Sequence, residues 1–304
     1  MPNAIELQNV TKRFGRQTAV DSIDLVVPEG AIYGFIGPNG SGKTTTLRMI
    51  LRIFQPDAGQ VTVLGQPTGK TADDRLGYLP EERGLYKRMK VKDVLTYYAR
   101  LKGMYDCKSE IERWLQRLDA TAWAGKKIDA LSKGMAQKIQ FIAAVIARPK
   151  LVILDEPFSG LDPVNLESLK EAVISLRESG TTVVFSTHDM DMAEKMCDTI
   201  FMIFKGKKVL DGSLSSIQSE YAVDLVRVQF DDSSAGLPAL PGVSNVVSNG
   251  PFYEFQIDDI EQSQQILNRL SQHSPLTHFE IVKPSLHDIF VQIARPEPNH
   301  QPAI

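Results

Sequence analysis

A glycine-rich stretch near the N-terminus has the residue types and spacing of a phosphate-binding loop. It matches the pattern G-x-x-x-x-G-K-[ST] and consists of Gly37, Pro38, Asn39, Gly40, Ser41, Gly42, Lys43, Thr44 and Thr45. The glycines allow successive backbone N–H groups to turn toward one anion, and the N-terminus of a following helix adds its positive dipole end. Lys43 can reach the β- and γ-phosphates, and the Thr44 hydroxyl can ligate Mg²⁺. The stretch therefore predicts a nucleotide site.

Two carboxylates, Asp155 and Glu156, directly follow the apolar run 151–154. In open α/β sheets, ligands bind at the carboxyl ends of such strands. Asp155 would belong to the Mg²⁺ shell of the phosphate site, and Glu156 would polarise the attacking water as general base. Ordinary surface acids at a strand end are the alternative. The phosphate loop favours the catalytic interpretation, because hydrolysis at that loop needs these residue types.

Apolar runs and helical patterns alternate along most of the chain, which predicts the elements that position these residues. Short N-terminal strands are expected at 5–10 and 23–27, joined through 11–15, and further strands at 60–64 and 76–79. Buried strands are expected at 31–36, 151–154, 181–186 and 199–204, with helices at 43–53, 163–179 and 190–197. Fully apolar strands that alternate with helices predict an α/β fold with a mostly parallel sheet covered on both faces.

Two changes in the pattern of apolar residues divide the chain further. Helical periodicity over 91–119 and 133–147 predicts a helical subdomain inserted at about 88–148. We assign 1–218 to the main domain and 219–294 to a small α+β domain, with strands at 223–230, 243–248, 252–257 and 279–283 and helices at 260–272 and 286–293. The Pro-rich tail 295–304 is expected to be disordered.

Composition narrows the class of protein. The 304 residues carry a formal net charge of −3, so no global basic field indicates nucleic acid as a partner. No apolar run approaches the roughly 20 residues that a membrane-spanning helix needs. The two cysteines, Cys107 and Cys197, sit in helical patterns, and we expect reduced thiols of a cytosolic protein.

The segment 131–135, Leu-Ser-Lys-Gly-Met, resembles the L-S-G-G-Q signature of ABC-type ATPases. Lys133 replaces the first glycine of that motif, and Met135 replaces its glutamine, to which the family assigns a ribose contact. In the family, the serine and glycine at the positions of Ser132 and Gly134 contact the γ-phosphate that the other subunit holds. A simple N-cap role for Ser132 is the alternative.

Other residues fall in the order of the same family. The segment 159–163 resembles the D-loop and contains Asp162, and His188 resembles the switch histidine at a strand end. Phe14 stands where the family has an aromatic residue that stacks on adenine, although a core position is its alternative. Glu81 stands at the position of the Q-loop glutamine, where a carboxylate would be a stronger Mg²⁺ ligand than an amide. The resemblance therefore implies a P-loop ABC-type nucleotide-binding domain with ATP and Mg²⁺ as cofactors.

A finer resemblance concerns the segments 78–86, 132–135, 157–163 and 286–290. They are similar to the sodium-efflux and multidrug branch of bacterial ABC-2 exporters, whose ATP-binding subunits often carry a small C-terminal domain. This implies Na⁺ or a drug-like compound as the candidate cargo. The C-terminal domain itself would act as a dimer brace, a regulatory module or a structural cap.

The family's site needs a phosphate loop and a signature segment from opposite subunits. The resemblance therefore implies a homodimer that closes head to tail around two Mg-ATP and hydrolyses them. An integral membrane permease, as a separate chain, would dock on the helical subdomain and on the loop 81–88 with its Arg83 and Arg88. The chain would then lie peripherally on the cytoplasmic face of the inner membrane. The alternatives are a soluble ABC ATPase that acts on ribosomes or nucleic acid, and an importer ATPase.

Overall fold

The computed structural model describes residues 2–67, 74–82, 84–221, 225–232, 235–259 and 262–294. The chain folds into two compact units, Met1–Leu214 and Ser215–Ile304. The expected boundary at 218/219 falls inside helix α7 (Leu214–Glu220). The tail 295–304, for which disorder was expected, lies outside the described residues. Within those residues, no helix has the length and apolar character that crossing a membrane requires.

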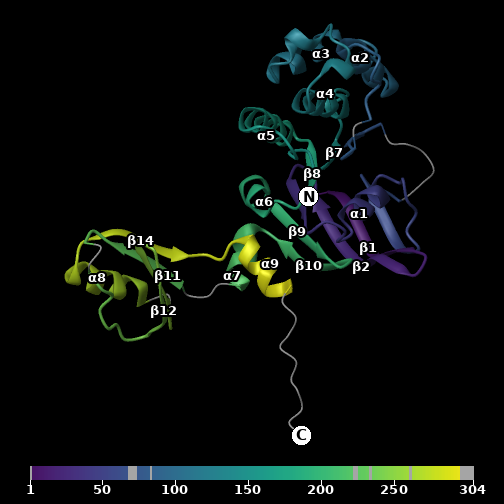
Figure 1. The fold of residues 1–304 in the computed structure, drawn as a ribbon. Coiled ribbons are helices and arrows are strands. Elements are labelled where there is room, and N and C mark those ends of the chain that lie inside the picture. The colour runs from purple at the N-terminus through teal and green to yellow at the C-terminus, as the bar shows by residue number, and fades with distance from the viewer. Residues whose placement is uncertain are drawn as a thin grey trace. The chain divides into compact units, whose positions relative to one another are not determined.

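A six-stranded sheet forms the centre of the first unit, with strand order β10-β9-β3-β8-β7-β6 (Figure 1). All neighbours are parallel except β10, which pairs antiparallel with β9. The strands are β3 (Ile32–Ile36), β6 (Leu76–Leu79), β7 (Leu151–Asp155), β8 (Thr182–Thr187), β9 (Thr199–Phe204) and β10 (Lys207–Gly212). The predicted mostly parallel sheet is confirmed. The sequence did not predict β10, because this edge strand buries only Leu210 and so lacks an apolar run.

The second sheet of this unit is antiparallel, with order β2-β1-β4-β5. Its strands are β1 (Asn3–Phe14), β2 (Gln17–Pro28), β4 (Ala58–Val63) and β5 (Gln66–Pro67). The expected strands 5–10 and 23–27 were too short, and residues 11–14 belong to β1 rather than to a connection. Asn9 and Ser22 have φ of 48° and 49°, and the β1–β2 register shifts along this region. Such irregularities break the period of two by which a strand is recognised.

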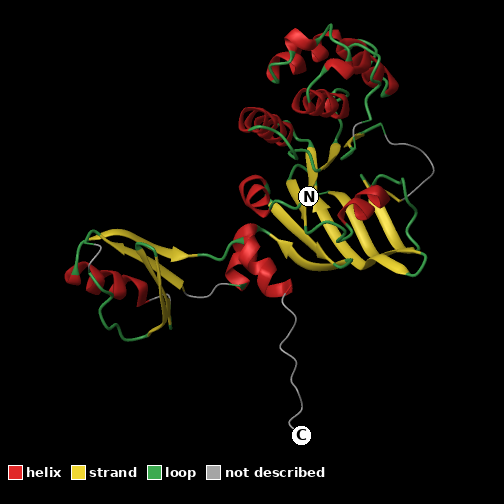
Figure 2. Cartoon of the chain, in the orientation of Figure 1, coloured by secondary structure: helices red, strands yellow, loops and turns green. Residues whose placement is uncertain are grey.

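Both faces of the parallel sheet are covered. On one face, helix α1 (Lys43–Ile50) shares a core with both sheets, including Ile5, Tyr33 and Leu47. Figure 2 shows the strands of this unit gathered together with α1 against them. On the other face, Ile32, Val152 and Phe185 share a core with helices of the unit. These helices are α2 (Val91–Leu101), α3 (Lys108–Arg117), α4 (Lys133–Val145), α5 (Pro163–Glu178) and α6 (Met190–Met196), with 3₁₀ turns η1 (Thr121–Trp123) and η2 (Ile128–Ala130).

The second unit is an α+β domain with its own core, as predicted. Its sheet has the order β12-β13-β11-β14, and Val226, Phe255 and Leu270 are buried in its core. The strand β14 begins at Leu276, three residues before the expected start, because Leu276 pairs with Phe230 at the end of β11. The elements are β11 (Leu225–Phe230), β12 (Val243–Asn249), β13 (Phe252–Ile257), α8 (Ser263–His273), β14 (Leu276–Val282) and α9 (Leu286–Ala294).

A buried carboxylate on α3 ties the helices of the first unit together. Glu110 is only 4% exposed, and it accepts hydrogen bonds from Arg113, from Arg148 Nη2 at 2.7 Å and from Trp114 Nε1 at 3.0 Å. Burial acts to raise the pKa of Glu110, but the hydrogen bonds from Arg148 and Arg113 outweigh it and leave the pKa below its ordinary value. The group therefore contributes stability above its unfolded-state pKa of about 4.3, and loses it as the pH falls through the folded-state value.

Replacing Glu110 with alanine should destabilise the first unit. We expect a loss of about 2–3 kcal/mol at pH 7, because the Trp114 N–H and two guanidinium groups lose their acceptor. Urea unfolding can be followed by tryptophan fluorescence, since both tryptophans, Trp114 and Trp123, lie in this helical part. The loss should shrink below pH 4. The exposed neighbour Glu112→Ala is the control, and equal midpoints for the two variants would contradict the assignment.

Candidate active site

The phosphate loop connects β3 to α1, and its tight path depends on glycine. Gly37 and Gly42 have φ of 147° and 114°. A Cβ on Gly37 would lie 2.2 Å from Ile203 O, and a Cβ on Gly42 would lie 2.5 Å from Ala19 O. Only glycine fits at such positions. Helix α1 begins at Lys43, directly after Gly42, so its free N–H groups point into the loop.

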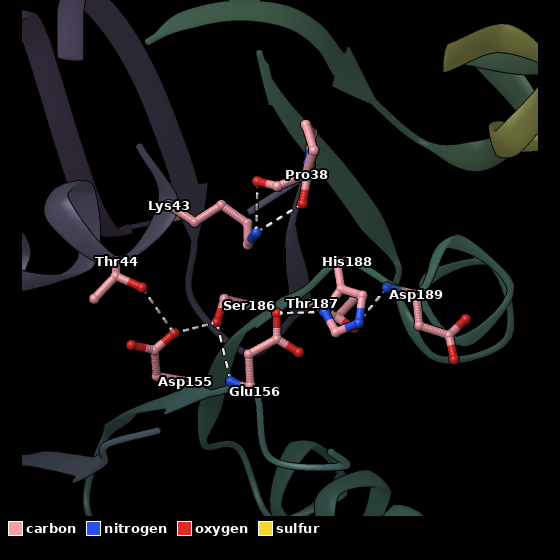
Figure 3. A network of polar contacts seen from close by, with 10 residues as sticks. Pro38, Lys43, Thr44, Asp155, Glu156, Ser186, Thr187, His188 and Asp189 are labelled. Carbon is pink, nitrogen blue, oxygen red and sulfur yellow. Dashed lines mark hydrogen bonds and ion pairs between the residues drawn. The ribbon is translucent and has the colours of Figure 1, made fainter. Parts of the chain in front are cut away.

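The Lys43 side chain bridges two backbone carbonyls of the phosphate loop. Its side chain is buried, and Nζ donates hydrogen bonds to Gly37 O at 2.6 Å and to Pro38 O at 3.2 Å (Figure 3). Burial lowers the pKa of Lys43, while the nearby carboxylates, with Glu156 first among them, act to raise it. Ser41 Oγ is buried and has no hydrogen-bond partner among the residues that the structure describes. The unpaired Ser41 hydroxyl and the buried Lys43 ammonium group of this loop are suited to binding the phosphate groups of a nucleotide.

The carboxylate pair lies at the carboxyl end of β7, as predicted for a ligand site. Asp155 is buried, and the Thr44 hydroxyl donates to its Oδ1 at 3.4 Å. Glu156 follows with a φ of 50°, a conformation that costs a non-glycine residue about 1–2 kcal/mol. Strain of this kind is common where a side chain must be aimed at a reacting group.

Asp155 and Thr44 offer the oxygen ligands that Mg²⁺ prefers. Within the described residues, no group of three His, Cys, Asp or Glu side chains could hold a metal ion by itself. One carboxylate and one hydroxyl fit an ion that also binds phosphate oxygens and water. The pair therefore suits Mg²⁺ that arrives with a nucleotide.

Ser186, on β8, links the Asp155 carboxylate to the backbone of Glu156, and the sequence did not predict this role. Its hydroxyl donates to Asp155 Oδ1 and accepts the Glu156 N–H at 3.0 Å (Figure 3). This contact follows from the parallel register, in which Asp155 and Ser186 are neighbours. A sequence alone gives no register between strands 30 residues apart in the chain. Ser186 is thus a positioning residue for both acids.

His188 lies at the same carboxyl end of the sheet, directly after β8. Its Nδ1 is 3.0 Å from Glu156 Oε1, and about half of its side chain is exposed. The next residue, Asp189, caps α6 by accepting the Met192 N–H at 3.0 Å. The imidazole is therefore held between a fixed helix start and the carboxylate that it contacts.

A cavity of about 470 Å³ opens above the loop. Phe14 and Glu81 line it together with loop residues and Glu156, and so do Gln17 and Ala19, which the sequence did not single out. Phe14 is 46% exposed and meets Phe54 edge to face at 5.5 Å. The alternative that Phe14 is a core residue is therefore wrong, and adenine stacking remains a prediction for this ring.

Of the four predicted nucleotide-binding residues outside the phosphate loop, Phe14 lines this cavity and the other three do not. Ser132 caps α4 by accepting the Met135 N–H at 3.3 Å, as its alternative role required. Asp162 caps α5 by accepting the Asn165 N–H at 3.0 Å, and this hydrogen bond holds the pKa of Asp162 below its ordinary value. A Cβ on Gly134 would come within 3.4 Å of Asn165 Nδ2. The starts of α4 and α5 thus lie against each other, outside the cavity that holds the phosphate loop.

Comparison with known proteins identifies the chain's family. A family model described as "ABC transporter" matches residues 20–159, and one described as "ATP-binding protein DrrA1-3-like, C-terminal domain" matches residues 212–294. The chain is 44% identical over 290 residues to the uncharacterized ABC transporter ATP-binding protein YhaQ of Bacillus subtilis (strain 168), covering 95% of this chain and 97% of YhaQ. The chain belongs to the ABC transporter ATP-binding proteins.

Two further similarities support the same family. This ABC transporter ATP-binding protein is 32% identical over 303 residues to the Nod factor export ATP-binding protein I of Paraburkholderia xenovorans (strain LB400), covering 96% and 98% of the two chains. A solved structure of the ATP binding subunit of an ABC transporter matches with a TM-score of 0.66 and 27% identity, over 72% of this chain and 93% of that one. The expected P-loop ABC fold and ATPase activity coupled to transport are thereby confirmed.

Glu81 is the departure from the family pattern that touches the cavity. If it ligates Mg²⁺, Glu81→Ala should raise the Mg²⁺ concentration for half-maximal ATPase activity by about 3- to 10-fold, because a charged oxygen ligand is lost. Glu81→Gln should have a smaller effect. The exposed Glu82→Ala is the matched control. Unchanged Mg²⁺ dependence and rate in both Glu81 variants would show that this carboxylate is not a ligand.

Proposed function

We propose that this chain is the ATPase subunit of an exporter and works as a head-to-tail homodimer around two Mg-ATP. One observation supports the dimer above the others: Ser132, Gly134 and Asp162 lie outside the cavity that the phosphate loop and Glu156 line in the same chain. A second copy would supply these groups to the open side of the cavity. The helix start at Ser132 then brings a hydroxyl and a positive dipole end to the γ-phosphate.

Within one site, the residues of this chain have separate tasks. The loop N–H groups and Lys43 bind and orient the phosphates. Thr44, Asp155 and Glu81 would hold Mg²⁺, which supplies charge stabilisation when it is bound. Glu156 accepts the proton of the attacking water at a carboxylate oxygen, and His188 Nδ1 fixes that carboxylate at 3.0 Å. Ser186 positions the Asp155 carboxylate and the Glu156 backbone.

We further propose that a separate integral membrane permease carries the cargo and docks on the helical subdomain. An apolar groove of about 250 Å³ lies there, lined by residues of β6, α2 and α4 and of the loop before α2, such as Tyr78, Tyr98 and Leu85. Arg88, at the end of the predicted docking loop, is described and exposed, whereas Arg83 lies outside the described residues. Peripheral placement on the cytoplasmic face of the inner membrane follows from this partner.

The named relatives bear on the direction of transport. One relative is named for export of Nod factor, which favours the exporter over the importer alternative. Na⁺ and drug-like compounds remain the candidate cargoes for this chain, and the permease would select among them. Neither a ribosome nor nucleic acid is expected as a partner.

Mixing two inactive variants tests the head-to-tail site. Lys43→Ala damages the phosphate loop, and Gly134→Asp places a bulky anion at the start of α4, where 3.4 Å separates a Cβ from Asn165 Nδ2. Each variant alone should hydrolyse ATP poorly. A mixed dimer contains one intact loop opposite one intact signature, so mixing should restore part of the activity and give ATP-dependent particles of about twice 33.8 kDa. A mixture no better than its parts would contradict the shared site.

A further inference from the structure

A second cavity, of about 490 Å³, lies at the amino ends of the parallel strands β7 and β8. The nucleotide site lies at the carboxyl ends of the sheet. Lys150 directly precedes β7 and Thr181 directly precedes β8, and both line this cavity. The phosphate site lies at the other end of β7, beside Asp155. Five strand residues at 3.3 Å each separate the two ends by roughly 16 Å. The cavity is therefore distinct from the nucleotide site.

Four cationic side chains line this cavity: Arg113 and Arg117 on α3, Arg148 after α4, and Lys150 before β7. Among the lining residues, all of which the structure describes, Glu110 is the single acid. Its carboxylate is already held by Arg113 and Arg148. The cavity thus carries three more positive than negative charges, in a chain whose net charge is −3. All four cationic side chains are exposed to solvent, so they are accessible to an anion from solution. A bound anion would reduce their mutual repulsion.

Two of these cations form ion pairs with Glu110, and the other two form none with the residues that the structure describes. Glu110 holds Arg113 and Arg148 by one nitrogen each, so the remaining guanidinium N–H groups stay available as donors. Arg148 has a φ of 53°, a left-handed conformation that is usual at a helix end for glycine rather than arginine. Arg117 lies over the Trp114 ring at 5.8 Å, and neither it nor Lys150 forms an ion pair with any described residue.

The opposite wall limits which ligand can bind. The hydroxyls of Ser175, Ser179 and Thr181 already donate to backbone carbonyls, at 3.0, 2.8 and 3.2 Å. They offer the ligand acceptor oxygens only, so the cations must hold its anionic groups. Guanidinium groups bind two oxygens of one phosphate at once, and a volume of this size exceeds that of a single small ion.

From this arrangement we infer that the cavity between α3 and the α5–β8 turn is a binding site for a soluble anion with two phosphate groups. Arg117 and Lys150 provide its unpaired charges, and Arg113 and Arg148 provide oriented donors. The inference does not rest on the proposed exporter function.

Pyrophosphate is the probe, used without Mg²⁺ on the full-length Lys43→Ala variant, in which binding at the phosphate loop is weakened. Calorimetric titration should show one pyrophosphate per chain, bound at least tenfold more tightly than orthophosphate, with an affinity that falls as salt is raised. Adding Arg117→Gln and Lys150→Gln should weaken binding by about tenfold or more. Both positions lie outside the Glu110 hydrogen bonds, so ATPase activity measured without Lys43→Ala should be unchanged.

Two controls complete the experiment. Lys108→Gln with Lys126→Gln removes two exposed cations of the same region that do not line the cavity, and binding should persist. Lys150→Arg preserves the charge and should also bind. Absence of pyrophosphate binding in Lys43→Ala, or equal weakening by the Arg117/Lys150 and Lys108/Lys126 pairs, would overturn the inference.

Discussion

Glu156→Gln is expected to abolish ATP hydrolysis while ATP binding is retained. The amide preserves the shape of the side chain and its position after β7, but it cannot accept the proton of the attacking water. Loss of a positioned general base lowers the rate by about 10²- to 10⁴-fold. Phosphate release and equilibrium binding of a fluorescent ATP analogue separate the two effects.

Glu178→Gln is the control for this substitution, because Glu178 is an exposed acid at the end of α5 that does not line the nucleotide cavity. It should hydrolyse ATP at the normal rate. Substantial residual turnover in Glu156→Gln would mean that another group accepts the proton. His188, 3.0 Å from Glu156, would then be the first residue to replace.

Lys43→Ala is expected to cause the second large loss, in ATP binding itself. The ammonium group is buried at the base of the cavity and would give the phosphates a charge-assisted hydrogen bond. Removing such a bond lowers affinity by roughly 10- to 100-fold, and hydrolysis should fall with it. Lys43→Arg should not restore binding, because the planar guanidinium cannot occupy the space between Gly37 O and Pro38 O.

The pH dependence of ATP binding provides an independent check on Lys43. Burial lowers its pKa, so the free protein should lose the positive charge at a lower pH than an ordinary lysine does. ATP affinity of the wild type should therefore decline on the alkaline side, and the affinity of Lys43→Ala should not. The exposed Lys92→Ala is the matched control, and it should follow the wild type.

The sequence predicted those parts of the site that are local in the chain. The phosphate loop, the acids after β7 and His188 each sit at the end of an apolar run, so strand and turn could be recognised together. The role of Ser186 was not predicted, because it depends on the β7–β8 register. Its neighbours in space are distant in sequence, and no periodicity indicates such a contact.

The misjudged parts of the fold have similar physical causes. The strand β1 continues through Thr11 to Phe14, but irregular backbone at Asn9 hides its alternation. At the sheet edge, β10 has one buried residue and no apolar run. The basic cavity gathers residues from α3, from the start of β7 and from the α5–β8 turn, and only the folded chain brings these together.

Co-purification with the Glu156→Gln variant tests whether the chain works with a membrane permease. The tagged variant would be expressed in its native cell, trapped with ATP and recovered from detergent-solubilised membranes, with Lys43→Ala as the untrapped control. The exporter function predicts a multi-span membrane protein in the trapped sample, at a higher yield than in the control. Recovery of ribosomal proteins or nucleic acid instead, with no membrane protein, would contradict it and favour the soluble ATPase.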